Sequence, residues 1–515
     1  MEKKLLVSAL LSLLISSAYG AQAQGRQDEK DLESSAQSLK VDGDKADSKK
    51  ADSKEIDSKK DTFQTYVAKS TKFIESVKGF AFGRYTANFG KDASGYAQQW
   101  RMILNAKTID YKGFSFGAGV FFGLGTSIAD GANSFDDIAG SRAAALGRRI
   151  GDRFSISQIY VQKDFKDLKF KAGRINIVSP MNDSSLDIGS ALKVSGESDT
   201  KIGKLHYEAS VYDSWNTDYG FYILSGRGQL GSNGSTDTSF GFGNTMAIFG
   251  LSYEDTLNKG RIKARFFYSY ANRLYDYMIF SDVTYSHPLN EHVSFSLKAQ
   301  TALLGLNANP SIKSRNAGAY VLNQEFLGSD PNFHHAKDRG IYNINASLEA
   351  FSFGVKVGFL GSFADGYGVM HDGEGDIDVP GKIWLSGITA SYEGFSFLGS
   401  GSKQGSSLYL PYIQLSYKID SKFKIGLDLV ALRGKNNMPL FTAKGIGHNN
   451  SSLPKLWPTL PKGADDNVFK DIKIYEATFT ASYNFTPNFR LSGYYGMWFG
   501  DVSLSRARIE ARYTL

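Results

Sequence analysis

Charged side chains recur at every second position along several apolar stretches of the chain. The last eleven residues, 505–515, place Arg506, Arg508, Glu510 and Arg512 in one row and apolar residues in the other. Successive side chains of a strand leave opposite faces, so such a stretch has one charged and one apolar face. A row of arginines lowers the energy of an anion in transit and makes paired hydrogen bonds to a carboxylate. The charged face is therefore a candidate wall for an aqueous pore.

The segments that would carry these residues alternate over about ten residues each, the length that a tilted strand needs to cross a bilayer. They lie at 99–107, 204–212, 261–270, 292–300, 342–350, 383–392, 409–417, 422–431, 475–483 and 488–498. Short turns such as 420–422 alternate with long polar stretches, for example 214–242 and 434–470. With 54 Gly, 28 Tyr and 36 Phe but only 11 Pro, the composition also favours strands and turns. We predict an all-β, transmembrane antiparallel barrel of about 18 strands, within a range of about 16 to 20.

The residues before the barrel divide into three predicted segments. Residues 1–23 have a basic start, a short apolar stretch and small residues before Gly20 and Ala23, which is typical of a secretory signal peptide. Residues 24–61 repeat Asp, Ser and Lys and are expected to form a charged, disordered periplasmic linker. Apolar residues at helical spacing predict a short amphipathic periplasmic helix at 62–78, followed by the barrel at 79–515.

The polar rows of the clearer strands predict a mainly basic pore wall. The pore-lining candidates are Arg101, Lys107, Lys204, Arg261, Lys263, Arg265, Lys298, Lys356, Lys424, Arg490, Arg506, Arg508, Glu510 and Arg512. Fewer acidic residues share these rows, so the wall would favour anions. Two alternatives stay open, because the same cations can bind lipopolysaccharide or pair with acidic loop residues that brace the barrel.

Other candidate sites carry a weaker signal. The seven His are scattered, there is no Cys, and no spacing indicates a catalytic centre, so we expect no enzyme. Alternate acidic residues at Asp372, Glu374, Asp376 and Asp378 offer oxygen ligands that suit Ca²⁺. The full twelve-residue calcium loop is absent, so a plain acidic loop is favoured and no cofactor is expected. The modest net charge of +7 and the export signal argue against nucleic acid as a partner.

Several motifs resemble a known family. FKAGRINIVSPMNDSSLDIGSALKVSG followed by KLHYEASVYDSWN resembles the strand, inward-folded loop and strand of OprD-type specific porins, and GRYTANFGKDASGYAQQWRMILNA resembles their opening hairpin. The layout is also similar to campylobacterial and Helicobacter major outer-membrane porins. The resemblance implies an 18-stranded barrel, a homotrimer, and a loop near 178–188 that constricts the pore with Asp183 and Ser184 at its eyelet. Ser185 and Leu186 depart from the arginine that usually follows this pair.

These observations predict a porin in the outer membrane of a Gram-negative bacterium, reached by Sec-dependent export. It would pass small hydrophilic solutes passively, with a preference for anionic or zwitterionic ones. Constriction is expected from Arg148 and Arg149 in one loop and from Asp183, Ser184 and Asp187 in the other. The expected partners are bilayer lipid, lipopolysaccharide and the barrel-assembly machinery, which reads a terminal aromatic that we place at Tyr513 because the chain ends in Leu515. A surface adhesin anchored by the barrel, with long loops that bind host molecules, is the alternative.

Overall fold

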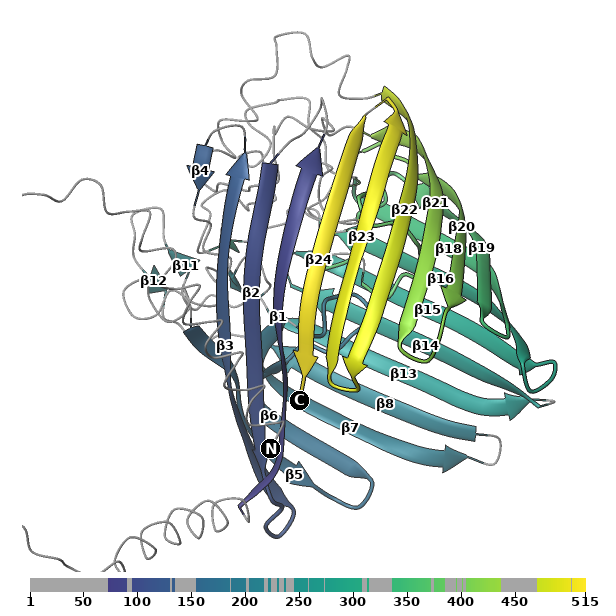
Figure 1. Ribbon diagram of the computed structural model, residues 1–515. Coiled ribbons are helices and arrows are strands. Elements are labelled where there is room, and N and C mark those ends of the chain that lie inside the picture. The colour runs from purple at the N-terminus through teal and green to yellow at the C-terminus, as the bar shows by residue number, and fades with distance from the viewer. Residues whose placement is uncertain are drawn as a thin grey trace, which may run out of the picture. The chain divides into compact units, whose positions relative to one another are not determined.

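The chain folds into one large antiparallel sheet in the computed structural model (Figure 1). The structure describes residues 73–89, 95–129, 132–134, 154–185, 187–200, 203–216, 221–223, 229–230, 236–237, 245–257, 259–272, 274–307, 313–314, 336–371, 375–384, 395, 401, 404–436, 470–501 and 503–515. The predicted signal peptide, the linker and residues 62–72 of the predicted helix lie outside these ranges, as do Arg148 and Arg149. Among the described residues, no helix is long and apolar enough to cross a membrane.

Eighteen long strands form the wall. They are β1 (Ile74–Phe89), β2 (Gly95–Thr108), β3 (Phe114–Ala129), β5 (Phe154–Asp164), β6 (Leu168–Asn176), β7 (Ile188–Thr200), β8 (Gly203–Tyr212), β13 (Met246–Leu257), β14 (Gly260–Ala271), β15 (Tyr275–Pro288), β16 (Val293–Leu306), β18 (Asp338–Ala350), β19 (Phe353–Ala364), β20 (Tyr409–Lys418), β21 (Phe423–Asn436), β22 (Lys470–Thr486), β23 (Phe489–Gly500) and β24 (Leu504–Thr514). Six short strands lie between them: β4 (Ala132–Ser134), β9 (Ser214–Asn216), β10 (Phe221–Ile223), β11 (Gln229–Leu230), β12 (Thr236–Asp237) and β17 (Lys313–Ser314).

The wall closes on itself. Each long strand pairs with the next in the chain, and β24 pairs with β1 from Ser505↔Phe89 to Thr514↔Phe80. Closure leaves none of the eighteen long strands with an unpaired edge, which a sheet in a bilayer needs because lipid offers no hydrogen bonds. The prediction of a closed barrel, and of a final strand that seals it, is confirmed.

Two element boundaries differ from the sequence prediction. β1 begins at Ile74, so the last five residues of the helix expected at 62–78 belong to the barrel wall. Lys78 pairs with Asn105 of β2, and this pairing overrides the helical spacing of the apolar residues. The strand expected at 383–392 is also wrong at its start, because Ile383 and Trp384 lie outside any strand and are buried.

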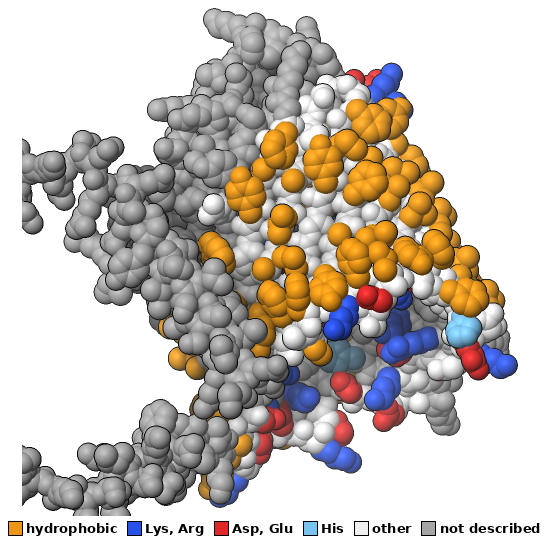
Figure 2. All heavy atoms as spheres, viewed as in Figure 1, with side chains coloured by type: hydrophobic (Ala, Val, Ile, Leu, Met, Phe, Trp, Pro, Cys, Tyr) orange, Lys and Arg blue, Asp and Glu red, His pale blue; other side chains and the backbone are white. Residues whose placement is uncertain are grey.

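The two faces of the wall have different chemistry. On β22, β23 and β24, the large apolar side chains of Phe479, Tyr495 and Ile509 are exposed on the outer face. Figure 2 shows hydrophobic side chains covering the outward face of these strands, with Lys, Arg, Asp and Glu gathered below them. An apolar belt on the outside of a closed antiparallel barrel is the surface that a bilayer requires.

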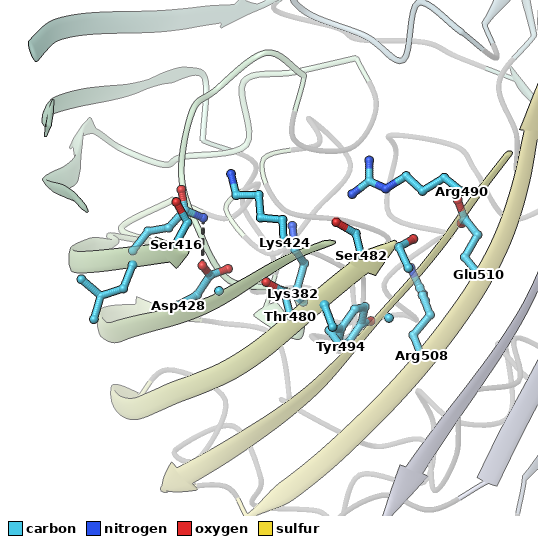
Figure 3. Close-up of a pocket in the computed structure, with 16 residues that line it drawn as sticks. Lys382, Ser416, Lys424, Asp428, Thr480, Ser482, Arg490, Tyr494, Arg508 and Glu510 are labelled. Atoms are coloured by element: carbon cyan, nitrogen blue, oxygen red, sulfur yellow. Dashed lines mark hydrogen bonds between the residues drawn. The ribbon is translucent and has the colours of Figure 1, made fainter. Parts of the chain in front are cut away.

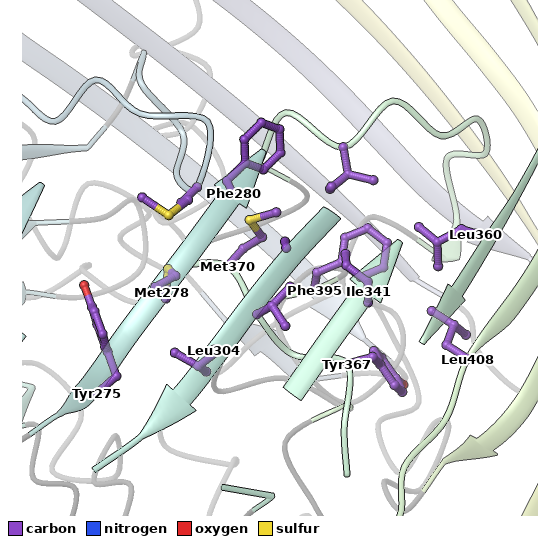
Figure 4. Close-up of a cluster of buried hydrophobic side chains, with 14 of the residues drawn as sticks. Tyr275, Met278, Phe280, Leu304, Ile341, Leu360, Tyr367, Met370, Phe395 and Leu408 are labelled. Atoms are coloured by element: carbon purple, nitrogen blue, oxygen red, sulfur yellow. The ribbon is translucent and has the colours of Figure 1, made fainter. Parts of the chain in front are cut away.

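A hydrophobic core fills part of the barrel interior. Met278, Phe280 and Leu304 from β15 and β16 pack with Met370 and Phe395 from the connection between β19 and β20 (Figure 4). Met278, Phe280 and Leu304 lie in the same rows as Asp282 and Gln300, so they face inward. Met370 and Phe395 of this connection therefore lie in the lumen and pack against this part of the wall.

Candidate functional site in the barrel lumen

Strand pairing defines which side chains face the lumen. Residues directly opposite each other in an antiparallel pair share one face of the sheet. Arg512 pairs with Phe82 of β1 and with Arg490 of β23, and the same inward row continues strand by strand around the wall. The register places every residue of the predicted pore-lining set on this inner face.

A segment that we call the strap, residues 375–384, crosses this inner face. Asp378 is its most firmly held residue. Its carboxylate accepts hydrogen bonds from Lys298 at 2.8 Å and Lys356 at 2.5 Å, and its N–H donates to Gln300 Oε1 at 2.8 Å. Burial raises the pKa of the Asp378 carboxyl, but the two lysines outweigh it and hold that pKa below its ordinary value. Asp378 is therefore a charged anchor between the strap and the wall.

Three further wall side chains hold the carbonyl of Asp378. Asn343 donates to it at 3.1 Å, Asn345 at 3.3 Å and the Tyr412 hydroxyl at 3.3 Å. Two residues earlier in the strap, Asp376 accepts a hydrogen bond from Arg265 at 2.7 Å. Contacts from β14, β16, β18, β19 and β20 thus fix this half of the strap.

A wall carboxylate holds the other half of the strap. Glu476 of β22 accepts hydrogen bonds from the N–H groups of Lys382 at 2.5 Å, Ile383 at 3.1 Å and Trp384 at 3.1 Å. The Trp498 indole donates to the same carboxylate at 2.8 Å. Because an ionised oxygen that accepts several N–H groups is held strongly, Glu476 anchors the strap to β22.

A turn next to Glu476 needs glycine. Gly381 has φ of +99°, a conformation that L side chains rarely adopt, and its N–H donates to Asp428 Oδ2 of β21 at 3.1 Å. Gln414 of β20 donates to the other oxygen of Asp428 at 2.8 Å. The strap is therefore bound at both ends by carboxylates, its own at one end and those of the wall at the other.

The loop between β6 and β7 also folds inward and contacts the strap. Its Met181 is fully buried in the lumen core, and the carbonyl of Pro180 accepts a hydrogen bond from Asp376 N at 2.8 Å. His371, just before the strap, donates from its backbone to the Met181 carbonyl at 2.8 Å. Its ring lies 2.7 Å from the Tyr275 hydroxyl, and burial lowers the pKa of His371 to about 3. A neutral histidine thus joins the two inward segments.

A cavity of about 370 Å³ remains open along β20 to β24 (Figure 3). Lys382 of the strap, Lys424 of β21 and Arg490 of β23 line it, and all three side chains are exposed. Within the described ranges, no carboxylate forms an ion pair with any of these three. Hydroxyl groups, among them Ser482 and Tyr494, line the wall between them. This cavity presents uncompensated positive charge to water.

Most of the other predicted pore-lining residues have partners or are buried. Arg261 and Lys263 pair with Glu254, and Lys107 pairs with Glu75 at 2.8 Å. Lys204 is exposed near one end of β8, opposite Glu254 in the sheet. These residues were predicted to line the pore, but carboxylates neutralise Lys107, Arg261 and Lys263.

The arginine row of β24 rests mainly on β1. Arg506 Nε donates to Asn88 Oδ1 at 2.8 Å, and Arg508 Nε donates to Thr86 Oγ1 at 2.9 Å. Arg512 lies over the Phe80 ring at 4.3 Å, and its guanidinium is 3.8 Å from Glu510. Arg101 of β2 and Arg506 are buried, whereas Arg508 and Glu510 also line the cavity. Part of this row therefore braces the closure between β24 and β1.

The predicted constriction-loop residues have distinct surroundings. Asp183 is exposed and accepts hydrogen bonds from Ser185, while the Ser184 hydroxyl donates to the Ser179 carbonyl at 3.0 Å. Asp187 is fully buried and accepts a hydrogen bond from the Trp215 indole at 3.1 Å. Asp187 therefore fixes the loop and does not face a solute.

Two of the four acidic residues proposed as a weak calcium site bind basic side chains of the wall. Asp376 and Asp378 bind Arg265, Lys298 and Lys356, while Asp372 and Glu374 lie outside the described residues. Among the residues that the structure describes, no cluster of three acidic or His side chains could hold a metal ion. The two carboxylates that can be placed are engaged by cations.

The residues that hold the strap have no local sequence signal for that role. Lys382 was not singled out, because the strap has no period. Asp428 and Glu476 were recognised only as acidic residues of the inward rows, because a lone wall carboxylate gives no local signal of what it binds. Lys171 and Lys193 were also missed, although they alternate along β6 and β7 and pair across the sheet. Their alternation with apolar residues is the signal by which Lys171 and Lys193 can be predicted to face inward.

Comparisons with known proteins show the same fold. No protein-family model matches the chain, and no curated protein matches it significantly. Among solved structures, Pseudomonas aeruginosa OpdL is 11% identical, with a TM-score of 0.52 over 85% of this chain and 98% of OpdL. Acinetobacter baumannii OccAB1 is 12% identical, with a TM-score of 0.55 over 86% of this chain and 97% of OccAB1. Pseudomonas aeruginosa OccK2 (OpdF) is 11% identical, with a TM-score of 0.53 over 86% of this chain and 98% of that protein. The chain therefore has the 18-strand barrel fold of these OprD- and Occ-type proteins, as its sequence motifs predicted.

Proposed function

We propose that the protein is an outer-membrane porin that lets small hydrophilic solutes diffuse passively, with a preference for anions. The observation that carries this proposal is the open lumen cavity with Lys382, Lys424 and Arg490 exposed in it. Uncompensated cations along a water-filled path attract anions and repel cations. The closed wall and its apolar outer belt support a location in a bilayer.

The same cavity supports a role for zwitterions. The partly exposed carboxylate of Glu510 lies on its wall, so a solute with separated opposite charges finds partners for both. Hydroxyl groups between them can replace the water that such a solute gives up. Contact with lipopolysaccharide, insertion by the barrel-assembly machinery and assembly as a homotrimer stay predictions.

Planar-bilayer recording of the purified protein tests the proposal. We expect stable stepwise openings in KCl, because part of the lumen stays open beside the strap. In a salt gradient, the reversal potential should show that Cl⁻ permeates better than K⁺. Absence of openings together with specific binding to cells would contradict the proposal and favour the adhesin, and a clear cation preference would contradict the role of the exposed cations.

A further inference from the structure

The cations of the lumen wall fall into two groups that differ in their partners. Along β14 to β19, Arg265, Lys298 and Lys356 face three carboxylates, those of Asp282, Asp376 and Asp378. Along β20 to β24, Lys424 and Arg490 have no such partner among the described residues. Two of the three carboxylates in the first group come from the strap and not from the wall.

Asp378 is the carboxylate of the first group that binds the most cations. Its carboxylate binds two lysines at once, and both lysines are only about a quarter exposed, at 25% and 21%. Its main chain is held separately, through Gln300, Asn343 and Tyr412. The position of Asp378 therefore does not depend on its charge alone. Its charge can also act on ions in the lumen.

We propose that Asp378 is a specificity-determining residue. Its negative charge completes the balance of the three carboxylates with Arg265, Lys298 and Lys356, and so confines the attraction of anions to the β20–β24 side of the lumen. This inference rests on the proposed pore function. Without the carboxylate, two ammonium groups would face the lumen with no opposite charge within hydrogen-bond distance. A charge in a narrow aqueous path acts on passing ions over several ångströms, because the Debye length at physiological salt is about 8 Å.

Charge substitution in the full-length protein tests the proposal through the reversal potential in a KCl gradient. Asp378→Asn should raise the ratio of Cl⁻ to K⁺ permeability roughly threefold, since one unit of negative charge is lost beside the path. Lys356→Gln should lower the ratio by a similar factor, because it leaves the group of three cations and three carboxylates with one net negative charge. Asp378→Glu keeps the charge and should keep the wild-type ratio.

The double variant Asp378→Asn with Lys356→Gln separates charge from mere loss of contact. It removes one charge of each sign, so the wild-type permeability ratio should return, although more strap contacts are lost than in either single variant. Asp420→Asn, in the exposed turn between β20 and β21, is the matched control and should leave the ratio unchanged.

Two results would overturn the inference. One is an unchanged ratio in both Asp378→Asn and Lys356→Gln. The other is a double variant shifted as far as Asp378→Asn or further, which would mean that displacement of the strap, and not charge, sets the ratio. A wild-type protein that forms no channel would instead contradict the proposed function, and it would be recognised before any variant is compared.

Discussion

The two sides of the lumen wall use the same residue types for different purposes. Along β14 to β19, Arg265, Lys298 and Lys356 are bound to carboxylates, and two of these carboxylates belong to the strap. Along β20 to β24, Lys424 and Arg490 extend into an open cavity (Figure 3). The strand pattern of both sides is the same alternation. The difference comes from a segment outside the strands. The strap supplies Asp376 and Asp378 to the cations of the first side, whereas it contributes Lys382 to the cavity of the other.

This difference limits what a basic row in a sequence can mean. An arginine or lysine in an inward row acts on solutes only when no carboxylate neutralises it and no segment buries it. Arg265 and Arg490 both lie in inward rows, yet Arg265, in the middle of β14, binds two carboxylates, and Arg490, at the start of β23, is exposed. We expect the variants below to change one side and spare the other.

Loss of the Glu476 carboxylate should have the largest effect. Glu476→Ala leaves three strap N–H groups and the Trp498 indole without their acceptor inside the barrel. We expect the free energy of unfolding to fall by about 4 kcal/mol, the usual cost of breaking a buried charged network. Urea titration of the protein refolded into lipid vesicles measures this. Glu349→Gln, which removes an exposed carboxylate 3.8 Å from Lys418, is the control and should change little.

The same variant also tests whether this carboxylate holds the strap in place inside the lumen. A strap freed from β22 should widen the path, so single-channel conductance should rise and become noisier. Wild-type conductance and stability in Glu476→Ala would contradict the role of this carboxylate as an anchor.

Truncation of Met181 should have the next largest effect. This side chain is fully buried between the β6–β7 loop and the lumen core. Met181→Ala removes that packing and leaves a cavity, so we expect a loss of about 3 kcal/mol in the same urea titration. Leu289→Ala, at an exposed turn position, should lose far less. Equal losses in the two variants would show that the loop does not pack as described.

Acidification should loosen the β14–β19 side through His371. The pKa of this buried histidine is lowered to about 3, whereas a released histidine has a pKa of about 6.5. A released or unfolded state therefore binds a proton that the native state does not, so stability is full above pH 6.5 and falls as the pH drops toward 3. The loss should reach about 2 kcal/mol at pH 5. Urea titrations at pH 7 and pH 5 measure it.

A histidine variant isolates this effect. His371→Phe keeps an aromatic ring beside Trp215 and Tyr275 but cannot be protonated, so the difference between pH 7 and pH 5 should shrink by that amount. His292→Phe, at an exposed turn between β15 and β16, should keep the wild-type difference. An unchanged pH dependence in His371→Phe would assign the effect to other groups.

The sequence predicted the wall well because a strand in lipid must alternate. Arg508 and Arg512 were placed on the inner face and Ile509 on the outer face from the period of two alone, and the pairing agrees. Closure of the last strand on the first followed from the same argument, since an open edge is not tolerated in a bilayer.

The arrangement inside the lumen could not be predicted in this way. Ile383 and Trp384 begin a stretch that alternates like a strand, yet they are buried inside the barrel because Glu476 binds their N–H groups. Asp378 resembled a metal ligand in sequence, and its partner Lys298 is 80 residues away along the chain. Such contacts depend on how the closed wall brings distant strands together, which no local pattern encodes.

The most direct test of the central claim removes charge from each side and compares reversal potentials in one KCl gradient. Lys424→Gln with Arg490→Gln takes two cations from the open cavity, and Lys356→Gln with Asp378→Asn takes a neutral pair from the β14–β19 side. We expect the first variant to lose most of the preference for Cl⁻, and the second to keep the wild-type value. Lys422→Gln, an exposed turn lysine beside the barrel end, should also match the wild type. The account would be contradicted if the first variant kept its preference for Cl⁻ while the second lost it.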